Sequence, residues 1–400
     1  MSRFPSALPP AGVNRQQSTG SREFILLCAC AAAQPTPERI ATIAEWNQAP
    51  PDWDEFLRLA EHHGILPLAA RNLVAHAPGL PSPIAQSLRS AYEGNVRRNL
   101  WYAAELARIS EHFEVRQVRA VPYKGPVLAQ SAYGDVALRN FGDLDFLISS
   151  DAFERTRLAL AELEYRPSQD YSSAVERYWL RDGYERAFDG PAGKYLVEMQ
   201  WRLLPRFYAV ELATHDLLER AGRTVVAGQE VPCLAPEDTL LALCLHAAKH
   251  LWTRLIWVCD IAETLRTHCI DYSLACQRAR EAGILRILGV SFWLAENLVG
   301  CHLPEGAEDV VHANPRVPAL GEQYVARLAR AATYDFESTE YFRLILHLRE
   351  RWSDRWRYVW RLVWTPGMGD LQAMKLPEKL FPLYRVVRLA RLMRKVIRYV

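Results

Sequence analysis

Residues 121–150 read VPYKGPVLAQSAYGDVALRNFGDLDFLISS, and this segment carries the strongest fold signal in the chain. An apolar stretch leads into a Lys-Gly turn, a short helical pattern follows, and an acidic but otherwise apolar run, GDLDFLIS, ends the segment. The composition of that run predicts an extended strand. Because alternate side chains of a strand share one face, Asp143 and Asp145 should direct their carboxylates to the same side.

These two carboxylates predict a cation between them. Like charges so close repel each other and raise each other's pKa unless a positive charge lies nearby. A divalent cation is the common solution, and hard oxygen ligands suit Mg²⁺ or Mn²⁺. Asp143 and Asp145 are therefore candidate metal ligands, and the alternative is a solvated strand end.

The Lys-Gly turn is the second candidate feature. A glycine directly after a strand lets the backbone approach a ligand, and its amide can donate to a phosphate, so Gly125 is a candidate for nucleotide binding. Pro126 suits the first turn of a helix, where its missing N–H is no loss. Lys124 and Arg139 would offset negative charge, which makes a coherent nucleotide site.

The segment resembles the DNA-polymerase-β-like nucleotidyltransferase superfamily, whose signature is a Gly-containing turn, a helix and an Asp-x-Asp strand. It is more closely similar to the bacterial "uncharacterised nucleotidyltransferase" family, and this similarity extends from about residue 52 to about residue 392. The chain departs from the family pattern at Pro126, where many active members have Ser or Gly, and at Gln200, which is often His. The residues that carry the resemblance are Lys124, Gly125, Tyr133, Asp135, Arg139, Asp143 and Asp145.

The resemblance implies a metal-dependent transfer of a nucleoside monophosphate from an NTP to an acceptor, with release of pyrophosphate. It also implies a third carboxylate on a neighbouring strand. Glu198 is the candidate, because it follows the predicted hairpin turn DGPAGK and lies inside a predicted strand. The alternative is a surface glutamate that pairs with Arg202 or Arg186.

Two other functions remain open at the level of sequence. The chain could be a catalytically degenerate transferase fold that serves as a binding or assembly component of a biosynthetic system, which the Gly-Pro turn and Gln200 favour. It could also catalyse a related phosphotransfer. The acceptor could be a small molecule, a peptide or a protein.

Composition limits the partners and the compartment. A net charge of +2 over 400 residues argues against a generally basic surface for a long nucleic acid. The eight cysteines form no CxxC pair, which favours reduced thiols in a cytoplasmic protein. The apolar stretch 24–33 is too short to span a bilayer and is interpreted as a core helix.

The predicted fold class is α+β, with a small mixed-sheet nucleotidyltransferase core flanked by N-terminal and C-terminal helical regions. Helical periodicity dominates on both sides of an α/β segment. The predicted organisation is a disordered tail (1–20), an N-terminal helical region (21–113), the α/β core (114–235), a helical region packed on the core (236–345), and Trp/Arg-rich helices (346–400).

A polar stripe marks the helical region after the core. We expect one continuous helix over residues 236–265, with His246, Lys249, His250 and Asp260 on one face. The two histidines could bind zinc, but no third ligand has suitable spacing. A network in which the aspartate orients a histidine is the preferred interpretation, and Lys249 or His250 could reach a phosphate.

The C-terminal sequence YRVVRLARLMRKVIRYV predicts an amphipathic helix. Such a helix could make peripheral contact with an anionic membrane surface or with an anionic partner. The alternative is a terminal helix docked by its apolar side with a solvated basic face. The basic face consists of Arg385, Arg388, Arg391, Lys395 and Arg398.

Overall fold

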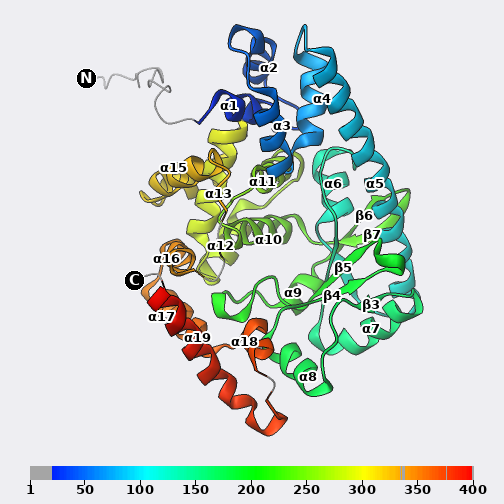
Figure 1. The fold of residues 1–400 in the computed structure, drawn as a ribbon, viewed down its shortest axis with the longest axis vertical. Helices are drawn as coiled ribbons and strands as arrows, with labels where there is room; N and C mark the ends of the chain where they lie inside the picture. Colours follow the sequence, from blue (N-terminus) through cyan, green and yellow to red (C-terminus); the bar gives the residue numbers. More distant parts are fainter. Residues whose placement is uncertain (1–19, 334, 336–337, 375, 399–400) are drawn as a thin grey trace, which may run out of the picture.

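The computed structural model describes residues 20–333, 335, 338–374 and 376–398, with side chains up to residue 394. Its architecture is α+β: a small mixed sheet is flanked by helices from both ends of the chain (Figure 1). The predicted fold class is therefore confirmed. The predicted disordered tail, apart from its last residue, lies outside the described residues.

The central sheet has five strands in the order β1-β2-β5-β4-β3. Strands β2 and β5 are parallel, whereas the other neighbours are antiparallel, which makes the sheet mixed. The β4–β5 hairpin turns at the DGPAGK segment, as predicted. The strands are β1 (Ala120–Pro122), β2 (Leu144–Ile148), β3 (Arg166–Pro167), β4 (Glu185–Asp189) and β5 (Leu196–Gln200).

The two faces of this sheet have different environments. Phe146 of β2 and Met199 of β5 share one face and pack against Phe113 and other apolar residues of helix α5 (Ser82–Val115). Asp145, Glu198 and Gln200 occupy alternate positions of the same strands and lie on the other face. Strand periodicity therefore places the acidic groups on the face away from α5. The other elements of this region are α6 (Gly125–Tyr133), α7 (Phe153–Glu162), α8 (Ser173–Asp182), α9 (Thr214–Glu219), and a separate hairpin of β6 (Gly222–Val226) and β7 (Gln229–Cys233).

The N-terminal helices lie at the top of Figure 1 and continue into the long helix α5. Phe24, Leu26 and Leu27 are buried, so the apolar stretch 24–33 does begin as a core helix. These elements are α1 (Arg22–Ala29), α2 (Pro37–Ala44), α3 (Trp53–His62), α4 (Leu66–His76) and α5.

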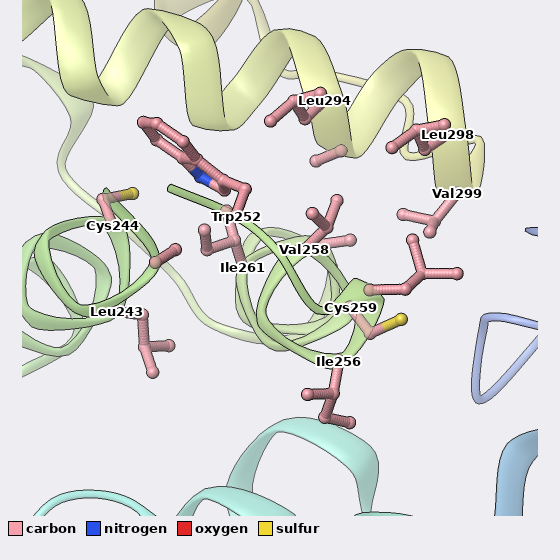
Figure 2. Packing of buried hydrophobic residues seen from close by; sticks show 14 of the residues in the cluster. Leu243, Cys244, Trp252, Ile256, Val258, Cys259, Ile261, Leu294, Leu298 and Val299 are labelled. Carbon is pink, nitrogen blue, oxygen red and sulfur yellow. The ribbon is translucent and has the colours of Figure 1, made fainter. Parts of the chain in front are cut away.

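The helical region after the core contradicts one prediction. Residues 236–265 do not form one helix, because the chain breaks between α10 (Pro236–Lys249) and α11 (Leu255–Thr267). Leu251 and Trp252 adopt positive φ values of 51° and 49°, which no α-helix permits. The buried Trp252 ring fills the space between these helices and α13, and its indole N–H donates to Ser291 (Figure 2). The remaining helices of this region are α12 (Tyr272–Glu281), α13 (Leu285–Val299), α14 (Glu305–His312), α15 (Val317–Leu328) and α16 (Thr339–Leu348).

The C-terminal segment packs back on the core at α8, near the bottom of Figure 1. Leu371, Phe381 and Tyr384 form a small cluster with Tyr178 and Trp179 of α8. This cluster connects α8 of the α/β part to the C-terminal segment. The segment comprises α17 (Trp352–Trp364), α18 (Met368–Ala373) and α19 (Tyr384–Arg398).

Helix α19 differs in orientation from the predicted terminal helix with a solvated basic face. Arg388 and Arg391 turn inward and pair with the buried Asp370. The apolar residues Val386 and Met393, which lie outside the predicted basic face, are each 59% exposed. The predicted solvated basic face is wrong at these two arginines, because a buried carboxylate requires a cation. The side chains of Lys395 and Arg398 lie outside the described residues.

The helices within the described part of the chain were all too short or too polar to cross a bilayer. Exposed apolar side chains gather instead on α17, where Trp352, Trp356 and Trp360 are 81%, 65% and 54% exposed. Contact of the C-terminal region with a membrane surface stays a prediction.

Candidate active site

A cavity of about 1030 Å³ lies between the acidic face of the sheet and helices α10 and α11, and we call it the site cavity. It brings together residues that are far apart in the sequence. Seven of the eight predicted site residues line it, namely Lys124, Arg139, Asp143, Asp145, Glu198, Lys249 and His250. Gly125 does not line it.

The three predicted carboxylates converge because of strand register. Asp145 of β2 is the direct neighbour of Glu198 in the parallel strand β5. Asp143 lies two residues before Asp145, immediately outside the strand, and it too lines the cavity. Side chains at paired positions of neighbouring strands point to the same face. The sheet therefore assembles Asp143, Asp145 and Glu198 along one wall.

Asp145 already has hydrogen-bonding partners in this structure. Its Oδ1 accepts from Lys124 Nζ at 2.9 Å and from Gln200 Nε2 at 2.9 Å. The same Gln200 amide donates to Glu198 Oε2 at 3.2 Å, and its carbonyl accepts from Tyr123 Oη at 2.6 Å. Gln200 therefore links two of the three carboxylates.

The remaining negative charge of the cluster is poorly compensated. Burial, together with the neighbouring Asp145 and Glu185, raises the pKa of Glu198 to about 8. Burial and Asp145 also raise the pKa of Asp143, which makes no ion pair with any described residue. Burial would lower the pKa of Lys124, but Asp145 outweighs it and the pKa rises above its ordinary value. The ionised forms of Asp143 and Glu198 are thus disfavoured in this structure.

Gly125 has a structural role at the turn. Its φ is +54°, a left-handed value that favours glycine. A Cβ at this position would lie 3.2 Å from the carbonyl oxygen of Asp143. Because Gly125 has no side chain, the N-terminal end of α6 can lie close to the backbone of Asp143.

Arg139 forms a buried ion pair instead of pointing freely into the cavity. Its Nε and Nη2 donate to Asp260 Oδ1 and Oδ2 at 2.8 and 2.9 Å. Tyr133 Oη donates to the same Oδ1 at 2.7 Å. Asp260 therefore orients an arginine and not a histidine, which corrects the predicted network. This unit fixes the end of α6 and the loop before β2 to α11.

Lys249 and the two histidines form the wall opposite the sheet. Lys249 Nζ donates to Tyr184 Oη at 3.2 Å, and burial lowers its pKa. The His250 ring stacks on Trp257 with centroids 4.8 Å apart, and burial lowers the pKa of His250 to about 3. His246 lies 4.8 Å from His250, centroid to centroid. Burial thus favours the neutral forms of the two histidines, and Lys249 and Arg254 are the basic side chains on this part of the lining.

The alternative interpretation of Glu198, a surface pair with Arg202 or Arg186, is not observed among the described residues. Arg202 donates to the carbonyl oxygens of Gly183 and Arg181, and Arg186 lies against the Tyr171 ring. Glu198 instead faces the cavity with the other carboxylates.

Sequence reasoning missed Glu185, which also lines the site cavity. Burial raises its pKa, although Lys249 opposes the shift. It is the antiparallel partner of Gln200 across the β4–β5 hairpin. Counting residues outward from the DGPAGK turn would have placed Glu185 opposite Gln200, two positions from the partner of Glu198 and on the same face.

The carboxylates offer the right donors for Mg²⁺ or Mn²⁺, and their raised pKa values indicate that a cation would be stabilised there. In the part of the chain that the structure describes, however, no three His, Cys, Asp or Glu side chains are placed to hold a metal ion together. Lys124 takes the position of a cation at Asp145 Oδ1. The donor chemistry fits a divalent ion, and binding would require Lys124 to move away from Asp145.

The raised pKa of Glu198 predicts a pH-dependent stability. In the unfolded chain this carboxyl ionises near 4.5, whereas in the folded protein it stays protonated up to about pH 8. The folded state therefore holds the extra proton between these values, and stability falls as the pH rises through this window. Glu198→Gln removes the effect, so in a chelating buffer the variant should gain more than about 1 kcal/mol over wild type between pH 5 and pH 9.

Urea unfolding at several pH values measures this difference. Exposed Glu61 provides a matched control, because Glu61→Gln should differ from wild type by the same amount at every pH. A Glu198→Gln difference that does not change with pH would contradict the raised pKa.

The geometry defines a class of protein. A glycine turn, a helix and an Asp-x-Asp strand, with an acidic residue on the neighbouring strand, form a nucleotidyltransferase-type core. The family described as "Uncharacterised nucleotidyltransferase" matches residues 49–300, and the chain belongs to this family. No curated protein and no solved structure matches the chain.

Proposed function

We propose that the protein is a metal-dependent nucleotidyltransferase that moves an NMP group from an NTP to an acceptor. The observation that carries this proposal is the pairing of Asp145 with Glu198 on parallel strands, with Asp143 beside them, in surroundings that raise the pKa of Asp143 and Glu198. Such a cluster is costly for folding unless it serves a ligand.

The chain's own residues would bind and orient the reactants. The acceptor's hydroxyl or amine attacks the α-phosphorus, the bond from that phosphorus to the β-phosphate oxygen breaks, and pyrophosphate leaves. Glu198 would orient the acceptor's hydroxyl or amine for this attack and lower its pKa, and the released proton would pass to solvent water. Lys249, and Lys124 once it leaves Asp145, would neutralise phosphate charge.

Asp143, Asp145 and Glu198 would hold the metal, which would require these side chains to draw closer together and Lys124 to leave Asp145. A bound Mg²⁺ or Mn²⁺ would supply charge stabilisation for the triphosphate. Gly125 supports the site through the turn and not through the cavity wall, so we propose it as a positioning residue. Arg139 belongs to the same support, because Asp260 engages its guanidinium.

Thermal unfolding with each NTP, with and without Mg²⁺, tests the proposal. A ligand that binds only the folded state stabilises it by about 1–3 kcal/mol when present at ten to a hundred times its dissociation constant. We expect stabilisation by at least one NTP, and we expect it to require the metal. Products formed from α-labelled and γ-labelled ATP then identify the chemistry: transfer of the γ label would indicate a phosphotransferase, and no metal-dependent stabilisation would reject the proposal.

One observation favours a second candidate, in which the fold is catalytically degenerate and acts as a binding or assembly component. The Lys124–Asp145 ion pair is buried and occupies a carboxylate oxygen that a metal would need. Stabilisation by a partner protein, without any effect of NTP and Mg²⁺, would support this candidate.

A further inference from the structure

A second cavity of about 420 Å³ adjoins the site cavity, and we call it the acceptor cavity. Both cavities share part of their lining at the start of β4 and in the segment after β5. A molecule in the second cavity would therefore meet Glu185 and could extend a reactive group toward the carboxylates. The shared residues are Tyr184, Glu185, Pro205 and Phe207.

Arg186 gives the acceptor cavity an unpaired positive charge. Its side chain is only 5% exposed, and its guanidinium lies 3.5 Å from the centroid of the Tyr171 ring. The guanidinium donates to the Gln169 carbonyl, but its Nε has no hydrogen-bond partner. Among the described residues, no carboxylate lies within ion-pair distance of Arg186. A buried guanidinium without a counter-ion is costly, and an anionic ligand would remove that cost.

The other arginines of the acceptor cavity already have carboxylate partners. Arg206 pairs with Asp182, and Arg388 and Arg391 pair with Asp370. An anionic ligand could therefore bind at Arg186 without displacing a carboxylate of the protein from its arginine. The remaining walls are largely apolar and aromatic, which suits an apolar body; they include Tyr171, Trp179, Phe207, Phe342, Met368 and Leu392.

The C-terminal segment supplies one side of this cavity. Residues 365–370 and three residues of α19 face α8 and β4 across it. All of them lie outside residues 49–300, the part that the family model matches. The buried Arg388–Asp370 pair fixes this side, which explains why α19 turns its arginines inward.

This proposal rests on the proposed function. We propose that the acceptor is a small molecule that has an apolar or aromatic body and one carboxylate or phosphate group, and that Arg186 binds this anionic group. The nucleophilic hydroxyl or amine lies at the end of the molecule opposite the anionic group. This end extends past Glu185 into the site cavity. The C-terminal segment then determines which acceptors bind, whereas the residues that carry out the transfer lie within residues 49–300, the part that the family model matches.

Binding measurements with three probes test this proposal. The probes are 4-hydroxyphenylacetate, 4-hydroxyphenyl phosphate and the uncharged 4-hydroxyphenylacetamide. Calorimetry on the full chain should show that at least one anionic probe binds about ten- to a hundredfold more tightly than the amide. The stronger anion identifies carboxylate or phosphate as the natural group. Equal binding of all three probes, or no binding, would overturn the proposal.

Arg186→Met should abolish the preference for the anion, whereas Arg206→Met, in the same cavity but paired with Asp182, should retain most of it. Gly367→Phe provides a second variant, because a Cβ there meets no atom closer than 3.7 Å and the ring would fill the cavity. It should weaken all probes alike. Anion preference that persists in a folded Arg186→Met protein, or full binding in folded Gly367→Phe, would contradict the assignment.

An acceptor must bind together with the nucleotide. Saturating ATP and Mg²⁺ should leave the anionic probe bound, and Arg186→Met should keep the metal-dependent stabilisation by ATP, because Arg186 does not line the site cavity. Displacement of the probe by ATP would overturn the acceptor assignment. If ATP and Mg²⁺ stabilise neither protein, the proposed transfer fails, while the probe measurements still decide whether the second cavity binds anions.

Discussion

Asp143→Ala should reduce nucleotide transfer by at least about a hundred- to a thousandfold without unfolding the protein. Asp143 is only partly buried, lies outside β2 and makes no ion pair with a described residue. Burial and the nearby Asp145 raise its pKa, so its removal relieves repulsion. The melting temperature should therefore stay constant or rise, while the metal-dependent stabilisation by NTP disappears.

The measurement combines transfer of an α-labelled NTP with thermal unfolding of the same preparation. Asp189→Ala is the matched control, because Asp189 is an exposed residue at the end of β4, in the same sheet but outside the site cavity. The control should keep both activity and stabilisation. A folded Asp143→Ala protein that transfers nucleotide at the wild-type rate would reject the mechanism.

Asp145 is less suitable for this experiment, although the two residues look equivalent in the sequence. It is 2% exposed and holds Lys124, itself 8% exposed. Removing the carboxylate would leave a buried ammonium without its partner, at a cost of about 3–5 kcal/mol. Loss of activity in Asp145→Ala would thus not separate catalysis from folding.

Local patterns predicted the elements that carry the carboxylates. The apolar run around Asp145 identified a buried strand, and the DGPAGK turn identified the hairpin that brings Glu198 next to it. These features depend on side-chain alternation and turn chemistry, which act over a few residues. For the same reason, the position of Glu185 was within reach of sequence reasoning.

Contacts between distant segments could not be predicted in this way. Helical periodicity continued through residues 250–254, but packing of Trp252 against α13 forces the chain out of the helix there. The arginines of α19 look like a solvent-facing stripe until Asp370 is placed beside them. In both cases a buried tertiary contact outweighs a local preference.

Gln200 shows the same limit within the site. In the sequence, Gln200 is notable only because the family often has a histidine at this position. In the structure its amide connects Tyr123 with Asp145 and Glu198, 77, 55 and 2 residues away. Gln200 can bridge the carboxylates because of the register between β2 and β5. This register depends on two separate segments and cannot be read from either segment alone.

Arg139→Ala should destabilise the protein by about 3–5 kcal/mol, because it leaves the carboxylate of Asp260 buried without its cation. Asp260 is 1% exposed and, among the described residues, would retain only Tyr133 as a side-chain donor. Equilibrium urea unfolding measures the loss. The matched control is Arg177→Ala, since the Arg177–Glu378 pair has side chains 62% and 60% exposed and should contribute less than about 1 kcal/mol.

A double variant separates the structural role of Arg139 from its predicted role in nucleotide binding. Replacing both members of a buried ion pair by apolar residues of similar volume is often neutral or stabilising, so Arg139→Met with Asp260→Leu should recover most of the lost stability. If Arg139 acts only by fixing α6 and the loop before β2 to α11, the double variant should also recover stabilisation by NTP and Mg²⁺. If its guanidinium leaves Asp260 to contact the triphosphate, the double variant should be stable but bind NTP at least about tenfold more weakly. A double variant as unstable as Arg139→Ala would show that the loss does not come from an uncompensated Asp260 charge.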